Sequence, residues 1–173
     1  MNGLNVEYGA QRGISPDTLR RYCTTADHWG MECIAFVNEK GGYSLRSFDT
    51  CYRRGPIGVS IPLANCPTSV YVFWDFFDFL SIAELRDDFS AIVLNWCLDE
   101  ETKAHCVELI KGYKACAILL PSLSLFDKWV KDVTEKAKPT KVYDYRGRNG
   151  THQTLNDFLT ADRARFVEAF GKR

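Results

Sequence analysis

The sequence lacks any long hydrophobic run. Its uncharged apolar stretches, such as Ser69 to Trp74, are far shorter than the ~20 residues that cross a bilayer. The first ten residues also lack the basic start and apolar run of a secretory signal. We therefore expect a protein that has no membrane segment and works in the cytoplasm.

The sequence also lacks any CxxC pair of cysteines. Its seven cysteines are an odd set, typical of free thiols in a reducing compartment and not of a disulfide framework. The only His/Cys neighbours are His105 and Cys106, and neighbouring side chains on a helix point apart. We therefore expect no structural metal site.

Net charge is absent as well, because 22 basic side chains balance 22 acidic ones. The balance hides an uneven distribution: residues 68–101 carry eight acidic groups and one basic group, whereas residues 138–173 carry eight basic and four acidic groups. This pattern argues against a general polyanion binder and leaves room for a local basic patch.

The first third of the chain predicts a helix followed by a β-hairpin. Ser15 is an N-cap and Pro16 a first-turn proline for a helix over 16–24. Apolar and alternating patterns predict strands over 33–37 and 43–46, joined by a glycine turn. Residues 50–67 hold three prolines and two glycines and indicate a loop or linker.

From residue 69 onward, short apolar runs alternate with amphipathic stretches. The expected strands are 70–73, 91–94, 116–120 and 141–143, and the expected helices are 76–88, 99–111, 125–136 and 154–170. Short, uniformly apolar strands separated by helices are typical of a parallel sheet that is covered on both faces. We predict an α/β fold with a Rossmann-like sheet of about four parallel strands and helices on both faces. This layer, residues 67–173, follows the small helix and hairpin module with its linker, residues 1–66.

Two features of this layer bear on function. The aromatic residues over 73–79 are too dense for one helical face, so part of the cluster is expected to pack on the N-terminal module or on a partner. Ligands of open α/β sheets bind outside the carboxyl ends of the strands. Those ends carry Trp74-Asp75, Asn95-Trp96, Pro121-Ser122 and Asp144-Tyr145.

Three segments carry a resemblance to a known family. Residues 11–48, with Gln11-Arg12-Gly13-Ile14-Ser15 and Gly41-Gly42-Tyr43-Ser44-Leu45-Arg46, resemble the segment ahead of the Toprim domain in primase-like proteins of bacterial mobile elements, notably those of Bacteroides relatives. Residues 70–81 resemble the first Toprim motif, and residues 155–159 resemble the closing segment. The resemblance implies a Toprim fold, a role in replication or mobilisation, and DNA, RNA or proteins of those systems as partners.

The sequence departs from the Toprim pattern where that pattern binds metal. The family has a glutamate and then a glycine at the end of its first strand, where this chain has Trp74 and Asp75. The family's Asp-x-Asp pair after the third strand corresponds to Pro121 and Leu123. Phosphoryl transfer of this type needs Mg²⁺ held by oxygen ligands, which Trp, Pro and Leu do not supply. Asp75 stands one position away from the lost glutamate, and such a shift turns a side chain toward another face.

These departures favour a degenerate Toprim-like domain that is not catalytic and has no cofactor. It would serve as a nucleic-acid-associated or partner-binding module, and the candidate nucleic-acid-binding residues, expected in loops, are Arg53, Arg54, Arg146 and Arg148. An alternative is an active Mg²⁺-dependent primase-like or nuclease-like enzyme that uses the displaced carboxylates Asp75, Asp78 and Asp144. A further alternative is a protein–protein adaptor whose acidic surface over 68–101 meets a basic partner.

Overall fold

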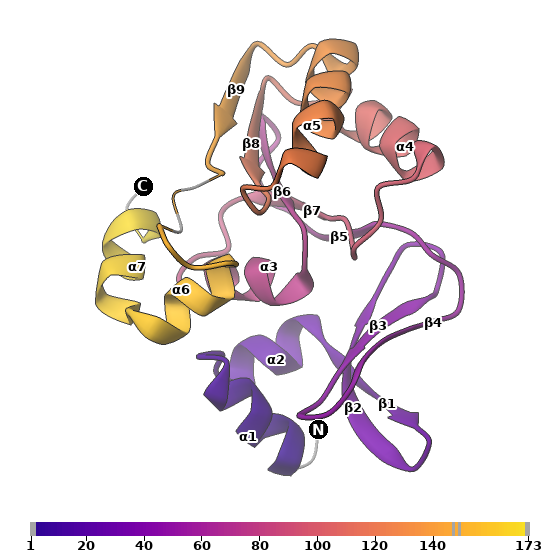
Figure 1. The fold of residues 1–173 in the computed structure, drawn as a ribbon, viewed down its shortest axis with the longest axis vertical. Helices are drawn as coiled ribbons and strands as arrows, with labels where there is room; N and C mark the ends of the chain where they lie inside the picture. The colour runs from indigo at the N-terminus through magenta and orange to yellow at the C-terminus, as the bar shows by residue number, and fades with distance from the viewer. Residues whose placement is uncertain (1–2, 147, 149, 172–173) are drawn as a thin grey trace.

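The computed structural model describes residues 3–146, 148 and 150–171, which form two sheets and the helices around them (Figure 1). The helices are α1 Gly3–Gln11, α2 Pro16–Tyr22, α3 Phe76–Ala83, α4 Glu100–Lys111, α5 Ser124–Ala137, α6 Leu155–Ala161 and α7 Arg163–Phe170. The strands are β1 Thr24–His28, β2 Met31–Val37, β3 Tyr43–Arg46, β4 Cys51–Arg54, β5 Ser60–Ala64, β6 Ser69–Phe73, β7 Ser90–Val93, β8 Ala115–Leu119 and β9 Lys141–Asp144. None of the described helices has the length and apolarity that crossing a membrane requires.

The N-terminal sheet consists of β1, β2, β3 and β4 in that order, with each pair antiparallel. The expected hairpin is its centre, with Val37 opposite Tyr43. Helix α2 begins as expected, because the Ser15 hydroxyl accepts a hydrogen bond from the Thr18 amide at 3.3 Å. Strands β1 and β4 were not predicted, because these edge strands are polar and show no apolar periodicity.

The second sheet has the order β5, β7, β6, β8, β9. Strands β6 to β9 are the four parallel strands that the sequence predicts. Strand β5 runs antiparallel to β7, so the expectation of a loop or linker over 50–67 is wrong: this segment holds β4 and β5. Pro62 lies in β5 where the register with β7 shifts between Ser60 and Leu63, and an irregular edge strand is a place where a sheet tolerates proline.

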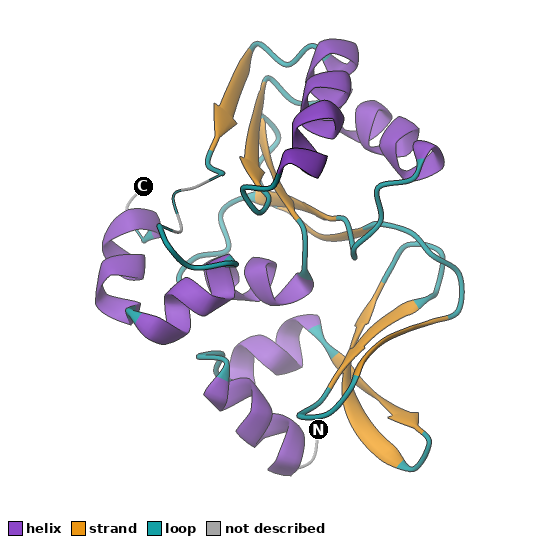
Figure 2. Cartoon of the chain, in the orientation of Figure 1, coloured by secondary structure: helices purple, strands orange, loops and turns teal. Residues whose placement is uncertain are grey.

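Helices cover both faces of the second sheet, as predicted (Figure 2). Side chains alternate along β6, so that Val70 and Val72 face the cluster with α4 and α5, whereas Phe73 faces the cluster with α3, α6 and α7. The single helix expected over 154–170 is two helices. Asp162 leaves the helical conformation between them and caps α7 by accepting from the Arg165 amide at 3.0 Å.

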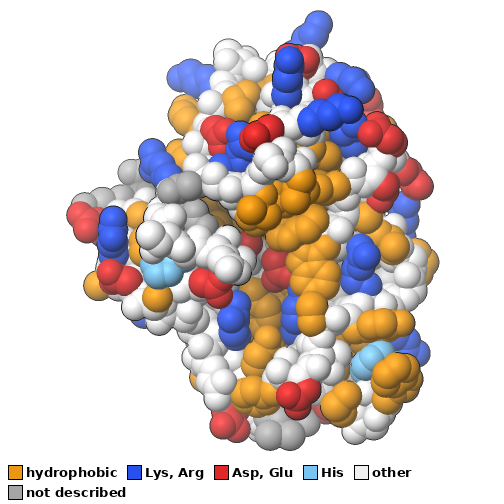
Figure 3. All heavy atoms as spheres, in the orientation of Figure 1, with side chains coloured by type: hydrophobic (Ala, Val, Ile, Leu, Met, Phe, Trp, Pro, Cys, Tyr) orange, Lys and Arg blue, Asp and Glu red, His pale blue; other side chains and the backbone are white. Residues whose placement is uncertain are grey.

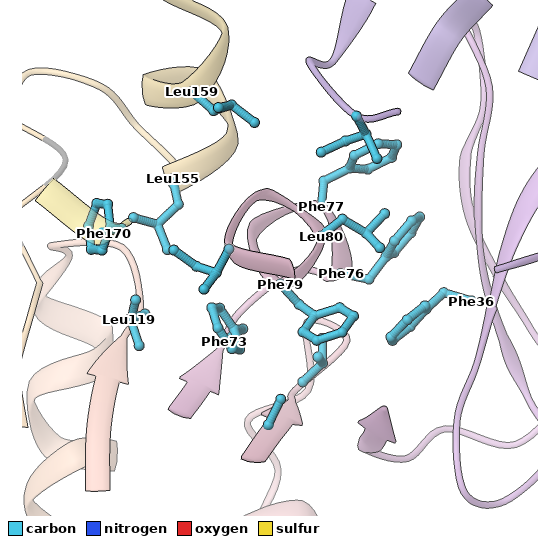
Figure 4. Packing of buried hydrophobic residues seen from close by; sticks show 14 of the residues in the cluster. Phe36, Phe73, Phe76, Phe77, Phe79, Leu80, Leu119, Leu155, Leu159 and Phe170 are labelled. Atoms are coloured by element: carbon cyan, nitrogen blue, oxygen red, sulfur yellow. The ribbon is translucent and has the colours of Figure 1, made fainter. Parts of the chain in front are cut away.

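One apolar core joins the N-terminal sheet to the second sheet (Figure 4). Phe36 of β2 stacks on Phe76 of α3 with ring centres 5.0 Å apart, and Phe77 meets Tyr8 of α1 edge-on at 5.7 Å. Part of the dense aromatic segment therefore packs on the N-terminal module, which is one of the two predicted possibilities. Burying one such ring stabilises the fold by about 1.5–3 kcal/mol.

Helices from the two ends of the chain are also tied together. The Asn156 side-chain amide at the start of α6 donates to the Arg12 carbonyl oxygen at 2.8 Å. The Arg163 guanidinium donates to the neighbouring Gly13 carbonyl oxygen at 3.0 Å. The segment after α1 is thus held by residues about 150 positions further along the chain.

Candidate functional site

A cleft of about 530 Å³ lies at the carboxyl ends of β6 and β8. We call it the strand-end cleft, and its lining residues are Trp74, Pro121, Ser122, Leu123, Gly150, Thr151, His152, Gln153 and Thr154. Figure 3 shows hydrophobic side chains gathered across the middle of the molecule, below the region of α5. A ligand at this cleft would therefore meet apolar surface together with small polar side chains.

Three of the four degenerate motif positions line the strand-end cleft together. Trp74, directly after β6, packs edge-on against Phe126 of α5 with ring centres 5.0 Å apart. Pro121 follows β8, and Leu123 precedes α5 with 53% of its surface exposed. The structure thus gathers the positions that the resemblance assigns to metal binding, and it places an indole, a proline ring and an isobutyl group there.

The fourth position, Asp75, points to a different partner. One of its carboxylate oxygens caps α3 by accepting from the Phe77 amide at 2.7 Å. The other oxygen forms a 2.5 Å ion pair with the guanidinium of Arg46, which comes from β3 of the N-terminal sheet. Both side chains are mostly buried, with 14% of Asp75 and 7% of Arg46 exposed. The carboxylate beside the end of β6 therefore joins the two sheets.

Arg46 is enclosed by aromatic rings as well as by Asp75. Its guanidinium lies 3.6 Å from the centre of the Trp96 ring and 5.3 Å from that of Phe76. Trp96 and Asn95 follow β7 in the left-handed conformation, and the side-chain Nδ2 of Asn95 donates to the Gly58 carbonyl oxygen at 3.0 Å. Sequence reasoning missed this arrangement, and its only signal was an arginine in a strand that is otherwise expected to be half-buried.

Asp78 lies inside the protein. Burial, and next the nearby charge of Asp75, raise the pKa of the Asp78 carboxyl to about 8. One of its oxygens accepts a hydrogen bond from the Asn156 amide at 3.0 Å, and the Asn156 side chain donates to the Ser81 hydroxyl at 2.9 Å. Asp78 thus joins α3 to α6.

Asp144, at the end of β9, is held by Arg146. The Arg146 guanidinium contacts both carboxylate oxygens of Asp144 at 2.7–3.0 Å and also pairs with Asp127 of α5 at 2.6 Å. Hydrogen bonds from Arg146 lower the pKa of Asp144. The three candidate carboxylates therefore have three separate sets of hydrogen-bond partners, although the charge of Asp75 is near enough to Asp78 to raise its pKa.

The four candidate arginines occupy two places. Arg146 is engaged as described, and Arg148 is exposed, with its guanidinium 4.3 Å from the centre of the Tyr145 ring. Arg53 and Arg54 lie on strand β4, so their expected placement in a loop is wrong. The Arg53 guanidinium lies 3.5 Å from the Asn95 carbonyl oxygen, whereas Arg54 is exposed and donates to the Asp27 carbonyl oxygen at 3.2 Å. Arg54 and Arg148 are the two whose side chains face solvent.

No protein-family model and no curated protein matches the sequence. Solved structures do match. The primase fragment of the bacteriophage T7 primase-helicase protein superposes with a TM-score of 0.73 at 16% identity, over 93% of this chain and 72% of that chain. A chain from a complex of the T7 lagging-strand DNA polymerase with primase domains bound to an RNA/DNA hybrid and dTTP gives 0.70 at 16% identity, over 92% and 87%.

A third match is the primase of Aquifex aeolicus, described with its zinc-binding and RNA polymerase domains. It superposes with a TM-score of 0.59 at 12% identity, over 97% of this chain and 56% of that chain. The chain has a Toprim-like, primase-like fold. This confirms the fold class that the sequence predicts, with α1, β1, β4 and β5 as additions. At these identities the likeness establishes the fold, and the function has to be argued from the residues.

Proposed function

We propose that this chain is a non-catalytic Toprim-like module that associates with nucleic acid in the replication or mobilisation system of a mobile element. The observation that carries the proposal is the ion pair between Arg46 and Asp75. It uses the one carboxylate at the end of β6 as a structural link between the two sheets.

The side chains at the strand ends do not fit Mg²⁺. This ion needs near-octahedral oxygen ligands at fixed positions, usually with one or two carboxylates from the protein. Asp75 is neutralised by Arg46, Asp78 is buried with its pKa raised to about 8, and Asp144 is paired with Arg146. Within residues 3–146, 148 and 150–171, no three His, Cys, Asp or Glu side chains are grouped so as to hold a metal ion. We therefore derive no catalytic step through a metal.

Two features support association with nucleic acid. The matched solved structures are primases, and one of them is a complex that contains an RNA/DNA hybrid. The side chains of Arg54 and Arg148 are exposed, so their guanidinium groups can contact phosphates, and contacts of this kind are independent of sequence. DNA or RNA and proteins of replication or mobilisation are the partners proposed.

The adaptor alternative has less support. It needs an acidic surface over 68–101, but Asp75 and Asp78 are turned inward. Glu84 is also engaged, because one of its oxygens accepts from the Ser15 amide and hydroxyl at 3.0 Å each, and it is 11% exposed. The acidic segment therefore contributes several of its carboxylates to internal contacts.

Binding of a labelled single strand, followed by fluorescence anisotropy at rising salt, tests the proposal. We expect weak binding that falls as salt rises, with a slope of log affinity near −0.9 per phosphate contact on duplex DNA and about −0.7 on single strands. Replacing Arg53, Arg54, Arg146 and Arg148 together by alanine should weaken binding and flatten the slope. Single replacements at Arg54 and Arg148 should account for most of the loss.

A matched control removes charge elsewhere: Arg20→Ala with Arg165→Ala, on the exposed surfaces of α2 and α7. This variant should bind like the parent protein. Absence of binding at low salt, or equal binding by the fourfold variant, would contradict the proposal. The active-enzyme alternative requires primer synthesis or strand cleavage with Mg²⁺, and we expect neither.

A further inference from the structure

The outer face of the N-terminal sheet carries exposed aromatic rings. Strand register places His28, Tyr52 and Arg54 on one face of the sheet. The opposite face carries Ile34 and Phe36, which belong to the core shared with α3. The face of His28, Tyr52 and Arg54 also carries the buried cluster of Cys33, Ala35 and Leu45, and its exposed rings lie beside the β1–β2 hairpin, which Figure 2 shows at the edge of the molecule.

Three of these rings lie in a row at the tip of the β1–β2 hairpin. The Trp29 ring stacks on His28 with centres 4.7 Å apart and planes 22° apart, and the His28 ring lies 4.4 Å from that of Tyr52. Trp29 is 87% exposed and Tyr52 is 48% exposed. We call these three residues the aromatic row. Figure 3 shows hydrophobic side chains gathered at this corner of the molecule.

The hairpin turn holds the Trp29 ring outward. Trp29 has φ 53° and Gly30 has φ 78°, and the Gly30 amide donates to the Asp27 carboxylate at 3.2 Å. A left-handed backbone conformation is unfavourable for a residue with a bulky side chain, and leaving a large apolar ring in water costs free energy. Trp29 combines a left-handed backbone with an exposed ring, and this combination favours a partner outside the chain that covers the ring.

Charge on this face favours an anionic partner. The Arg54 guanidinium donates to the Asp27 carbonyl oxygen, which places a cation beside the aromatic row. By register, the strand positions on this face carry Arg54 and no carboxylate, whereas Asp27 and Glu32 lie on the other face. Flat rings beside a guanidinium match the two parts of a single-stranded nucleic acid, since every base has a π-face and every nucleotide a phosphate.

We infer that the aromatic row is a stacking platform for unpaired bases of single-stranded nucleic acid, with Arg54 contacting the phosphate backbone. The inference rests on the proposed association with nucleic acid and adds its site and the single-stranded form of the ligand. Bases in a duplex already stack on one another, so a duplex can contact Arg54 but cannot cover the rings.

Anisotropy titrations with three labelled ligands of equal length test this inference: an oligodeoxythymidylate strand, a duplex and an abasic strand. The Trp29→Ala, Tyr52→Ala double variant should bind the oligodeoxythymidylate about tenfold more weakly or worse, since each stacked base contributes a factor of about 5 to 150. Its binding to the duplex and to the abasic strand should match that of the parent. Trp29→Phe, which keeps a ring, should retain most of the affinity.

Three further measurements exclude trivial causes. Ile57→Ala with Val167→Ala removes exposed hydrophobic surface elsewhere and should bind like the parent. Tryptophan emission should be quenched by the oligodeoxythymidylate in the parent and not in Trp29→Phe, because Trp29 is the strongly exposed indole. Thermal unfolding should show that all variants fold.

The outcomes separate this inference from the proposed function. If the parent binds all three ligands equally and the double variant behaves like it, the stacking platform is wrong and the association with nucleic acid stands. If the parent binds none of them at low salt, the proposed function fails with it. A Trp29 signal that responds to an apolar peptide but to no oligonucleotide also overturns the inference.

Discussion

At Asp78, burial decides the charge of a single side chain. The residue occupies the first turn of α3, close to the strand end where a metal ligand was a candidate. Its carboxyl is fully buried, accepts from the Asn156 amide, and has a pKa near 8. The neutral acid is therefore the form that the fold holds around neutral pH, and its role is to join two helices.

This pKa makes stability depend on pH. The ordinary pKa of the unfolded chain is 3.8 and that of the folded protein is about 8, so the folded state binds the proton more tightly between them. The stability from the protonated group is complete at acid pH and is lost as pH rises toward 8. Relative to the parent, Asp78→Asn should gain at least about 1 kcal/mol of unfolding free energy between about pH 5 and about pH 8, measured in urea.

The control is Asp17→Asn, in the first turn of α2. Its side chain is 95% exposed, so the stability difference between this variant and the parent should change little over the same pH range. If the difference in unfolding free energy between Asp78→Asn and the parent were equally independent of pH, the inference that Asp78 is a buried neutral acid would be wrong. If Asp78→Asn became less stable relative to the parent as pH rose, Asp78 would be charged in the folded state.

At the scale of elements, β3 and the start of α3 are coupled through the Arg46–Asp75 pair. Arg46→Met leaves a buried carboxylate without its partner and should cost about 3–5 kcal/mol of unfolding free energy. Asp75→Asn keeps a cap for α3 and loses the charge. The double variant should be less destabilised than the sum of the single variants, by about 0.5–3 kcal/mol in a double-mutant cycle.

The exposed pair Arg20 and Asp17 supplies the matched cycle. These side chains are 63% and 95% exposed, and their coupling should stay below about 0.5 kcal/mol. A coupling between Arg46 and Asp75 as small as this would show that the two sheets do not depend on the pair.

The strand ends also allow a test of the metal argument. Millimolar Mg²⁺ should leave the melting temperature of the parent unchanged, because a ligand stabilises only by binding the folded state. Trp74→Glu, Pro121→Asp and Leu123→Asp all place carboxylates in the strand-end cleft. Combined in one variant that keeps Asp75 for Arg46, they should produce Mg²⁺-dependent stabilisation. Mg²⁺-dependent nucleotidyl transfer or cleavage by the parent, lost in Asp75→Asn, would contradict the non-catalytic proposal.

The sequence predicted those elements whose signal is local. Strands β6 to β9 are short apolar runs between helices, and the carboxyl-end rule brought Trp74 and Pro121 to one cleft. The edge strand β5 was missed because it contains a proline, which argues against a strand, and because its short, irregular pairing with β7 leaves no regular apolar alternation. The partner of Asp75 was missed because Arg46 lies 29 positions away on another sheet, and no local pattern encodes such a contact.

At the scale of the whole molecule, the N-terminal module and the second sheet share one core. Phe36 packs on α3, and Ser15 bonds to Glu84. A fragment of residues 1–66 would expose these apolar surfaces, and an isolated small sheet is marginal in water. We expect that this fragment gives no dispersed, protected amide signals in NMR spectra, and that the whole chain unfolds in one transition. Dispersed, protected signals from the fragment would contradict this expectation.

The hydrogen bonds from Asn156 to Arg12 and from Arg163 to Gly13 determine when, during synthesis of the chain, the segment after α1 can be held in place. A chain leaves the ribosome from its N-terminus, so α1 and α2 emerge long before the helices that hold them. During that interval the segment after α1 lacks the hydrogen bonds that Asn156 and Arg163 donate to its carbonyl oxygens. The segment after α1 can therefore reach its native contacts only after α6 and α7 have been translated, and a chain whose translation stops before α6 leaves this segment exposed to proteases and chaperones.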